Sequence, residues 1–140
     1  LIIMDEPTSG LDPIFRRELL DILRDLMQRE DKTIFFSTHI TTDLDRIADY
    51  IIFMDQGEHI FTKESHRIAE DYAMVKGAHD LLDADTEKEF VSIRKSPYGF
   101  EGLTANRKQA EQIFGNMAVF ENATLEDIMY FTKKGRMEYV

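Results

Sequence analysis

The chain has 140 residues, of which 27 are acidic and 17 are basic, so its formal net charge at pH 7 is −10. Such an acidic chain is a poor candidate for sequence-independent binding of DNA or RNA, whose phosphates repel it. It contains no cysteine, which excludes disulfide bonds and thiolate metal sites. Its longest apolar run, Tyr50 to Met54, is far shorter than the roughly 20 residues that span a membrane.

A buried strand that ends in two acids is predicted at the start of the sequence. Leu1 to Met4 form an uninterrupted apolar run, and Asp5 and Glu6 follow it directly. Such a run is typical of a parallel strand with both faces buried, and open α/β sheets bind their ligands at the carboxyl ends of these strands. Two carboxylates there can hold a divalent cation and accept a proton. We expect the two side chains to point in opposite directions along an extended strand.

A helix is predicted to begin at Asp12 and Pro13. Aspartate accepts hydrogen bonds from the free amides of a first helical turn, and proline fits the first helical position. The helix is expected to end near Arg29–Asp31. Its predicted buried stripe consists of apolar residues at helical spacing: Phe15, Leu19, Ile22, Leu23, Leu26 and Met27.

A second buried strand is predicted at Thr33–Ser37, and His39 lies just beyond its end. A strand, a helix and a second strand in this order form a unit whose two strands are parallel. The carboxyl ends of both strands then share one edge of the sheet. We therefore expect His39 to lie near Asp5 and Glu6.

The rest of the first domain is predicted to contain a short helix and a hairpin. The expected segments are a helix from Thr41 or Thr42, a strand at Tyr50–Met54, a turn at Asp55–Glu58 and a strand at His59–Thr62. Lys63–Asp71 is interpreted as helix or linker. We place the domain boundary within it, so that residues 1–66 form one domain and residues 67–140 form the next.

The second domain is predicted to be small and of the α+β class. Its expected elements are strands at Tyr72–Lys76, Phe90–Lys95, Phe100–Thr104 and Met117–Glu121, a charged helix at Asp80–Glu89, a turn at Ser96–Gly99, a helix at Ala105–Phe114, and a helix that starts at a capping box of Thr124 and Asp127 and ends near Lys134. The order β-α-β-β-α-β is that of a ferredoxin-like split unit with one added helix.

The first domain resembles the ATPase domain of ATP-binding cassette (ABC) proteins. Leu1 to Glu6 resemble the Walker B strand of this family, the residues S-G-L-D after Thr8 resemble its D-loop, and Ser37–His39 resemble its H-loop. Each of these motifs alone is commonly a solvated loop. Here they occur together, in the expected order, around a strand–helix–strand unit, so the predicted fold is α/β, the C-terminal part of a P-loop ATPase.

The resemblance implies a role for each motif in binding and hydrolysing ATP. Asp5 would hold Mg²⁺ directly or through water, and Glu6 would be the general base that polarises the water attacking the γ-phosphate. His39 would contact the γ-phosphate and orient that water. In the family two ATPase subunits sandwich the nucleotides, and the D-loop residues at their interface would here be Ser9, Gly10, Leu11 and Asp12.

The residues of these motifs further resemble those of bacterial ABC exporters whose ATPase and membrane subunits are separate chains. The likeness extends over the D-loop, the helix segment Phe15–Leu20 and the segment Ile40–Gly57. It implies ATP-driven export, a second ATPase subunit, permease subunits on other chains, and a place on the cytoplasmic face of the cell membrane. Family members that act on ribosomes or DNA usually carry an Asn where this chain has Ser9–Gly10, so no nucleic-acid partner is expected.

Two motifs of the family are absent from this sequence. It contains no G-x-x-x-x-G-K-[ST] phosphate loop and no Leu-Ser-Gly-Gly-Gln-like signature, and in the family both precede the Walker B strand. We therefore expect the chain to be the C-terminal portion of a longer ATPase and to be inactive alone, since positioning the phosphates is nearly all of the catalysis. The alternative function is that of a non-catalytic dimerisation or regulatory module, formed by residues 67–140.

Overall fold

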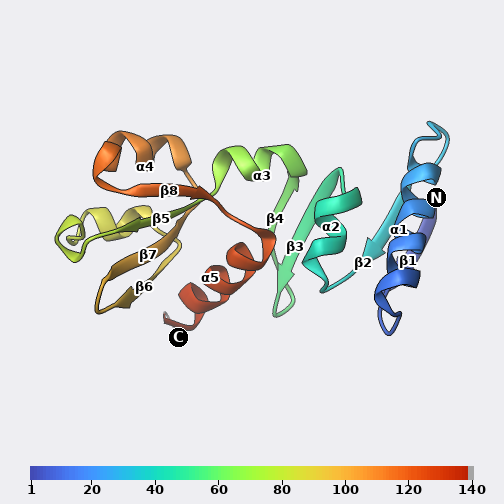
Figure 1. The fold of residues 1–140 in the computed structure, drawn as a ribbon, viewed down its shortest axis with the longest axis horizontal. Helices are drawn as coiled ribbons and strands as arrows, with labels where there is room; N and C mark the ends of the chain where they lie inside the picture. Colours follow the sequence, from blue (N-terminus) through green and yellow to red (C-terminus); the bar gives the residue numbers. More distant parts are fainter. Residues whose placement is uncertain (139–140) are drawn as a thin grey trace. The chain divides into compact units, whose positions relative to one another are not determined.

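The computed structural model describes residues 1–138, and the chain divides into two compact units, one of residues 1–49 and one that begins at Tyr50. Both units combine strands with helices (Figure 1), so the mixed α/β class is as predicted. The two compact units meet between residues 49 and 50, which is N-terminal to the predicted domain boundary between residues 66 and 67. That boundary falls within α3 (Ser65–Asp71). Within the described part of the chain, no helix has the length and apolar character needed to span a membrane.

The first unit is the predicted strand–helix–strand unit followed by a short helix. Its elements are β1 (Ile2–Asp5), α1 (Pro13–Met27), β2 (Ile34–Ser37) and α2 (Thr41–Ile47). β1 and β2 pair in parallel, and the register places Asp5 opposite Ser37. Asp12 caps α1 as predicted, because its Oδ1 accepts hydrogen bonds from the Ile14 and Phe15 amides, each 3.0 Å long. Caps of this kind stabilise a protein by about 1 kcal/mol.

The strands of the first unit are buried on one face only, which differs from the prediction. Met4, Ile34 and Phe36 pack against the core residues Leu20, Leu23 and Ile47. On the other face Ile3 is 70% exposed and Phe35 is 56% exposed. The unbroken apolar run indicated burial on both sides, but α1 and α2 supply apolar partners for one side of this two-stranded sheet.

The predicted apolar stripe of α1 is wrong at two positions. Phe15 and Ile22 are exposed, whereas Leu20, which was outside the predicted stripe, is buried. The inward face is set by residues three and four apart, which lie on one side of a helix: Arg16, Leu20, Leu23 and Met27. The apolar periodicity predicted the wrong buried face for α1 because the first residue of the inward face is an arginine.

The second unit begins with the predicted hairpin. β3 (Tyr50–Asp55) and β4 (Glu58–Glu64) pair antiparallel and are joined by Gln56 and Gly57. Both turn residues have positive φ, 49° for Gln56 and 78° for Gly57. Two left-handed residues are what a tight type I′ hairpin turn requires, and glycine reaches that conformation without steric cost.

A four-stranded antiparallel sheet forms the rest of the second unit. Its strands are β5 (Ala73–Gly77), β6 (Ser92–Ser96), β7 (Gly99–Thr104) and β8 (Val119–Asn122), in the spatial order β6-β7-β5-β8. β5 therefore lies between β7 and β8, so the two crossover connections are interleaved. α4 (Arg107–Phe114) and α5 (Leu125–Glu138) lie on opposite sides of this sheet (Figure 1).

Each side of the sheet is covered by different contacts. Val75 and Phe100 pack on one side against Ala110 and Phe114 of α4. On the other side the hydroxyl of Ser92 donates to the carbonyl of Phe131 in α5 at 2.6 Å. α5 begins at the predicted capping box: the Thr124 amide donates to Asp127 Oδ2, and the Asp127 amide donates to Thr124 Oγ1, both at 3.0 Å.

α5 also contacts the hairpin, which lies in the same unit. Arg136 Nη2 donates to Glu58 Oε2 at 2.9 Å, and Arg136 Nε lies 3.2 Å from Asp55 Oδ2. These ion pairs connect the last helix of the unit with the turn between its first two strands.

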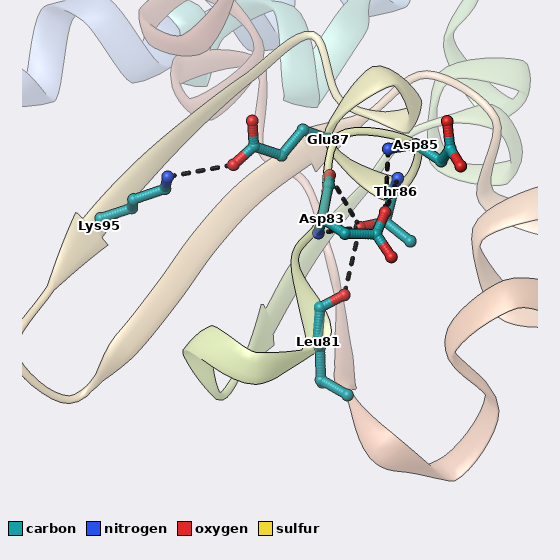
Figure 2. A network of polar contacts seen from close by, with 6 residues as sticks. All are labelled: Leu81, Asp83, Asp85, Thr86, Glu87 and Lys95. Atoms are coloured by element: carbon teal, nitrogen blue, oxygen red, sulfur yellow. Dashed lines mark hydrogen bonds and ion pairs between the residues drawn. The ribbon is translucent and has the colours of Figure 1, made fainter.

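The predicted charged helix at Asp80–Glu89 is wrong. Two short 3-10 helices, η1 (His79–Leu81) and η2 (Thr86–Glu89), take its place. Asp83 Oδ1 accepts from the Asp85 amide at 2.9 Å and from the Thr86 amide at 2.8 Å, and the Thr86 hydroxyl accepts from the Asp83 amide at 2.8 Å (Figure 2). Side chains of Asp and Thr thus bind the amides that a continuous helix would need.

Gly135→Ala tests the packing of α5 on β6. In an unrestrained helix this change would stabilise by about 1 kcal/mol. A Cβ at Gly135 would, however, lie 2.6 Å from the carbonyl oxygen of Val91. We expect the variant to lose about 1–3 kcal/mol of unfolding free energy in urea denaturation. Lys133→Ala, at an exposed position of the same helix, is the control, and a Gly135→Ala protein more stable than the parent chain would contradict this packing.

Asp83→Asn tests the electrostatic part of the turn between η1 and η2. Hydrogen bonds from the Thr86 and Asp85 amides hold the pKa of Asp83 below its ordinary value of 3.8. The charged form therefore stabilises the folded state fully above pH 3.8, and this contribution is lost as the pH falls through the lower folded-state pKa. Since Asn keeps the acceptor without the charge, the variant should be less stable at neutral pH, and the difference should shrink in acid.

Thermal unfolding over a pH series measures this difference. Asp80→Asn, which removes a neighbouring exposed carboxylate, is the matched control. A stability difference for Asp83→Asn that stays constant down to acid pH would contradict the role of the charge.

Candidate functional site

The predicted site residues gather where β1 and β2 end. Because the two strands are parallel, their carboxyl ends lie at one edge of the sheet, with Asp5 opposite Ser37. The Ser37 hydroxyl donates a hydrogen bond to Asp5 Oδ1. Just beyond the strands, His39 Nδ1 lies 2.9 Å from Glu6 Oε1. The expected approach of His39 to Glu6 is thus observed.

Glu6 does not have the extended backbone from which we expected its side chain to point away from that of Asp5. Its φ is 47°, in the left-handed region that non-glycine residues rarely adopt. The Glu6 amide donates to the carbonyl of Ser37 at 2.9 Å and lies 3.2 Å from its hydroxyl oxygen. A left-handed residue with a side chain costs roughly 1–2 kcal/mol, so the surrounding contacts must hold it. The backbone turns at Glu6, and its carboxylate meets His39.

The two carboxylate oxygens of Glu6 have different surroundings. Oε1 contacts the imidazole of His39, whereas Oε2 is buried and has no hydrogen-bond partner among the described residues. A buried acceptor without a donor destabilises the folded state, and such atoms are therefore rare in native proteins. Oε2 can accept a hydrogen bond from a water or ligand that enters the site.

The contact with Glu6 restricts what His39 can do at its other ring nitrogen. If Nδ1 carries the proton that faces the carboxylate, a neutral ring has only a lone pair at Nε2. A phosphate oxygen is also only an acceptor, so it can bind Nε2 when the ring is doubly protonated or when the Glu6 contact breaks. The His39 side chain is 72% exposed, which leaves the ring accessible to a ligand.

The oxygen donors at this edge fit a hard divalent cation. Asp5 offers an exposed carboxylate beside the Ser37 hydroxyl. Across residues 1–138 no three His, Asp or Glu side chains converge to form a complete protein cage for a metal. Mg²⁺ is commonly held by one or two carboxylates, with phosphate oxygens and waters as the other ligands. Asp5 is therefore suited to a Mg²⁺ ion that arrives with a phosphate ligand.

The four predicted D-loop residues, Ser9 to Asp12, form an exposed turn next to Glu6. The Ser9 amide donates to the Glu6 carbonyl at 3.1 Å, and the Leu11 amide donates to the Thr8 carbonyl at 3.2 Å. Gly10 has a φ of 78°, which glycine adopts readily. The turn joins the site directly to the first residue of α1, and its outer surface is open to a partner.

A buried polar cluster beside the site was not predicted from the sequence. Asp43 in α2 is fully buried and contacts Thr8 and Arg16. Arg16 lies outside the apolar stripe predicted for α1, yet its guanidinium pairs with this buried carboxylate. The signal that could have revealed it is its spacing, four residues before Leu20 on the inward face, since a cation there requires a buried acid.

Relatives of this chain are named as ATP-binding proteins of transporters. No protein-family model matches the chain. An ABC transporter ATP-binding protein of Bacillus subtilis, YdbJ, is 28% identical over 121 residues, covering 85% of this chain and 34% of the relative. The lantibiotic transport ATP-binding protein SrtF of Streptococcus pyogenes is 44% identical over 64 residues, covering 46% of this chain and 28% of the relative.

A third relative is named for import. The phosphate import ATP-binding protein PstB of Alcaligenes faecalis is 40% identical over 80 residues, covering 51% of this chain and 27% of the relative. The chain thus spans about a third or less of the length of each of these relatives. Its homologues, together with the residues at the ends of β1 and β2, relate the chain to the ATP-binding proteins of ABC transporters.

Proposed function

We propose that this chain supplies the Walker B, D-loop and H-loop part of an ATP-hydrolysing site in an ABC transporter. One observation carries the proposal: Glu6 and His39 are in contact at 2.9 Å, at the edge of the sheet where Asp5 also lies. The relatives named as ATP-binding proteins of transporters support it.

Glu6 acts in this proposal as the general base. A carboxylate within hydrogen-bond distance of a water can draw a proton from it as the water attacks phosphorus. Oε2 is the oxygen left for this role, since no described residue donates to it. Oε1 stays on His39, which fixes the direction of the carboxylate. Asp5 would hold Mg²⁺, which neutralises charge on the β- and γ-phosphates when bound.

His39 acts as the group that contacts the γ-phosphate. With Nδ1 directed at Glu6, the ring presents Nε2 to a phosphate oxygen, to which this nitrogen donates when it carries a proton. Loss of the γ-phosphate removes the acceptor at Nε2. His39 therefore couples the state of the nucleotide to the orientation of Glu6.

The phosphate loop and the signature motif of this site would come from residues outside the present sequence, which contains neither. We propose that the 140 residues are the C-terminal portion of a longer ATPase, in line with relatives of which the chain matches about a third or less. ATP hydrolysis and the thermal shift caused by Mg-ATP, measured on this chain and on the longer protein, test the proposal. Activity and a shift in the longer protein alone support it, and activity of the chain alone would overturn it.

We further propose export as the direction of transport, a second ATPase subunit that meets the D-loop Ser9–Asp12, and permease subunits on separate chains at the inner face of the membrane. The resemblance of the D-loop residues and of Phe15–Leu20 to those of bacterial exporters supports this direction. Residues 67–140 would be an accessory domain of ferredoxin-like topology, and the sheet order β6-β7-β5-β8 supports that assignment.

Glu6→Gln in the longer ATPase is the first test of the site. The amide keeps the shape of the side chain but cannot accept a proton, so turnover should fall at least about 100-fold while ATP binding persists. Hydrolysis of ATP and binding of a fluorescent ATP analogue measure the two effects. Glu18→Gln, at an exposed position of α1, is the matched control. Undiminished ATP hydrolysis in Glu6→Gln would contradict the assignment of Glu6 as the general base.

His39→Ala tests the contact with the γ-phosphate. Removing the imidazole deletes both the donor to phosphate and the contact that orients Glu6, so turnover should fall by about 100-fold. Steady-state ATP hydrolysis and the separate affinities for ATP and ADP are measured, with His66→Ala as the control, since His66 lies on the exposed surface of α3. If the variant changed only the affinity for ADP, the role at the γ-phosphate would be wrong.

A further inference from the structure

The carboxylate of Asp43 connects the loop that carries Glu6 with the two helices of the first unit. Asp43 is 0% exposed and Thr8 is 1% exposed. The Thr8 hydroxyl donates to Asp43 Oδ2 at 2.5 Å, and Arg16 Nε donates to Asp43 Oδ1 at 2.9 Å. Both oxygens of this buried carboxylate are therefore satisfied, one by the loop after β1 and one by α1.

Arg16 completes the cluster by neutralising the acid and binding α2 a second time. Its Nη2 donates to Thr42 Oγ1 at 2.8 Å, next to Asp43 in the chain. A buried carboxylate is tolerated when a cation and further hydrogen bonds compensate its lost hydration. Arg16 supplies the charge, so Asp43 is available to hold Thr8 in a fixed place.

Thr8 is the point at which the backbone of the Glu6 loop is held. Two consecutive turns share this residue: the Ser9 amide donates to the Glu6 carbonyl at 3.1 Å, and the Leu11 amide donates to the Thr8 carbonyl at 3.2 Å. On its other side, Glu6 is held by the hydrogen bond from its amide to the carbonyl of Ser37, 2.9 Å long. Glu6 thus lies between two attachment points and keeps its left-handed backbone conformation.

The segment that carries His39 is attached to the same carboxylate. The Asp43 amide donates to the Ile40 carbonyl at 3.1 Å, so Asp43 is in the first turn of the helix that follows His39. The position of Glu6 relative to His39 consequently depends on the bond between Thr8 and Asp43.

We propose that Asp43 and Thr8 are positioning residues that set the distance between Glu6 and His39. Asp43 holds the loop after β1 through Thr8, while its own helix holds the segment of His39. Neither residue contacts the reacting atoms. The catalytic part of this proposal rests on the proposed function, whereas the ordering of the loop is a property of the chain alone.

Hydrogen exchange on this chain tests the ordering of the loop. Thr8→Val removes the hydroxyl and keeps the shape of the side chain, whereas Thr8→Ser keeps the hydroxyl. In Thr8→Val the Ser9 and Leu11 amides should exchange roughly tenfold faster than in the parent chain, while the core amides of Leu20 and Leu23 change little. Thr8→Ser should restore slow exchange. Equal acceleration of loop and core amides, or no acceleration, would overturn the proposal.

Asp43→Asn gives a second variant for the same measurement. The new side-chain amide can still accept a hydrogen bond from Arg16 through its oxygen, but it lacks the charge that balances the guanidinium and the second acceptor oxygen that binds Thr8. The loop amides should again exchange faster. Asp45→Asn removes a carboxylate from the exposed face of the same helix and is the matched control, so an equal effect in both variants would contradict a specific role of Asp43.

Steady-state kinetics of the longer ATPase test the catalytic part. Thr8→Val should lower kcat at least about tenfold with KM for ATP nearly unchanged, since a misplaced base slows chemistry without weakening binding, and Thr8→Ser should recover most of the rate. An unchanged kcat, or a loss that Thr8→Ser does not restore, would overturn it. If the parent ATPase hydrolyses no ATP, the proposed function fails with the catalytic part, and hydrogen exchange still decides the ordering of the loop.

Discussion

The parallel pairing of β1 with β2 is the constraint on which the candidate site depends. Their register sets Asp5 opposite Ser37, and the residues after the two strands, Glu6 and His39, follow from that alignment. Because both strands run the same way, the residues after them emerge at one edge, where Glu6 meets His39 at 2.9 Å. An antiparallel pair would have placed the two motifs at opposite ends of the sheet.

The conformation and surroundings of Glu6 lower the stability of the folded state but give its carboxylate a defined position. Its backbone is left-handed, and one of its carboxylate oxygens is buried without a donor among the described residues. Both features are unfavourable on their own, and strained or unsatisfied groups of this kind cluster at functional sites. Nearby, the carboxylate of Asp43 accepts hydrogen bonds from Thr8 and Arg16, which connect the loop after β1 with α1 and α2.

The second unit is held together by contacts between segments far apart in the chain. β5 pairs with β7 and β8, and Arg136 of α5 reaches Glu58 in the turn of the first hairpin. The contact between α5 and the sheet requires a glycine at position 135, since the carbonyl of Val91 lies where a side chain would begin. The hairpin and the sheet therefore lie in one compact unit.

Local patterns in the sequence were enough to predict the strand–helix–strand order, the Asp12 cap, the hairpin turn within Asp55–Glu58, and the approach of His39 to Glu6, because each depends on neighbouring residues or on strand direction. Three features were missed, two because they depend on tertiary contacts and one because local side-chain hydrogen bonds compete with a helix. The inward face of α1 is set by the pairing of Arg16 with Asp43, which apolar periodicity cannot detect. Local side-chain hydrogen bonds outcompeted the helix predicted at Asp80–Glu89. The left-handed turn at Glu6 exists because Ser37 holds its amide, and that contact forms only once two distant strands have paired.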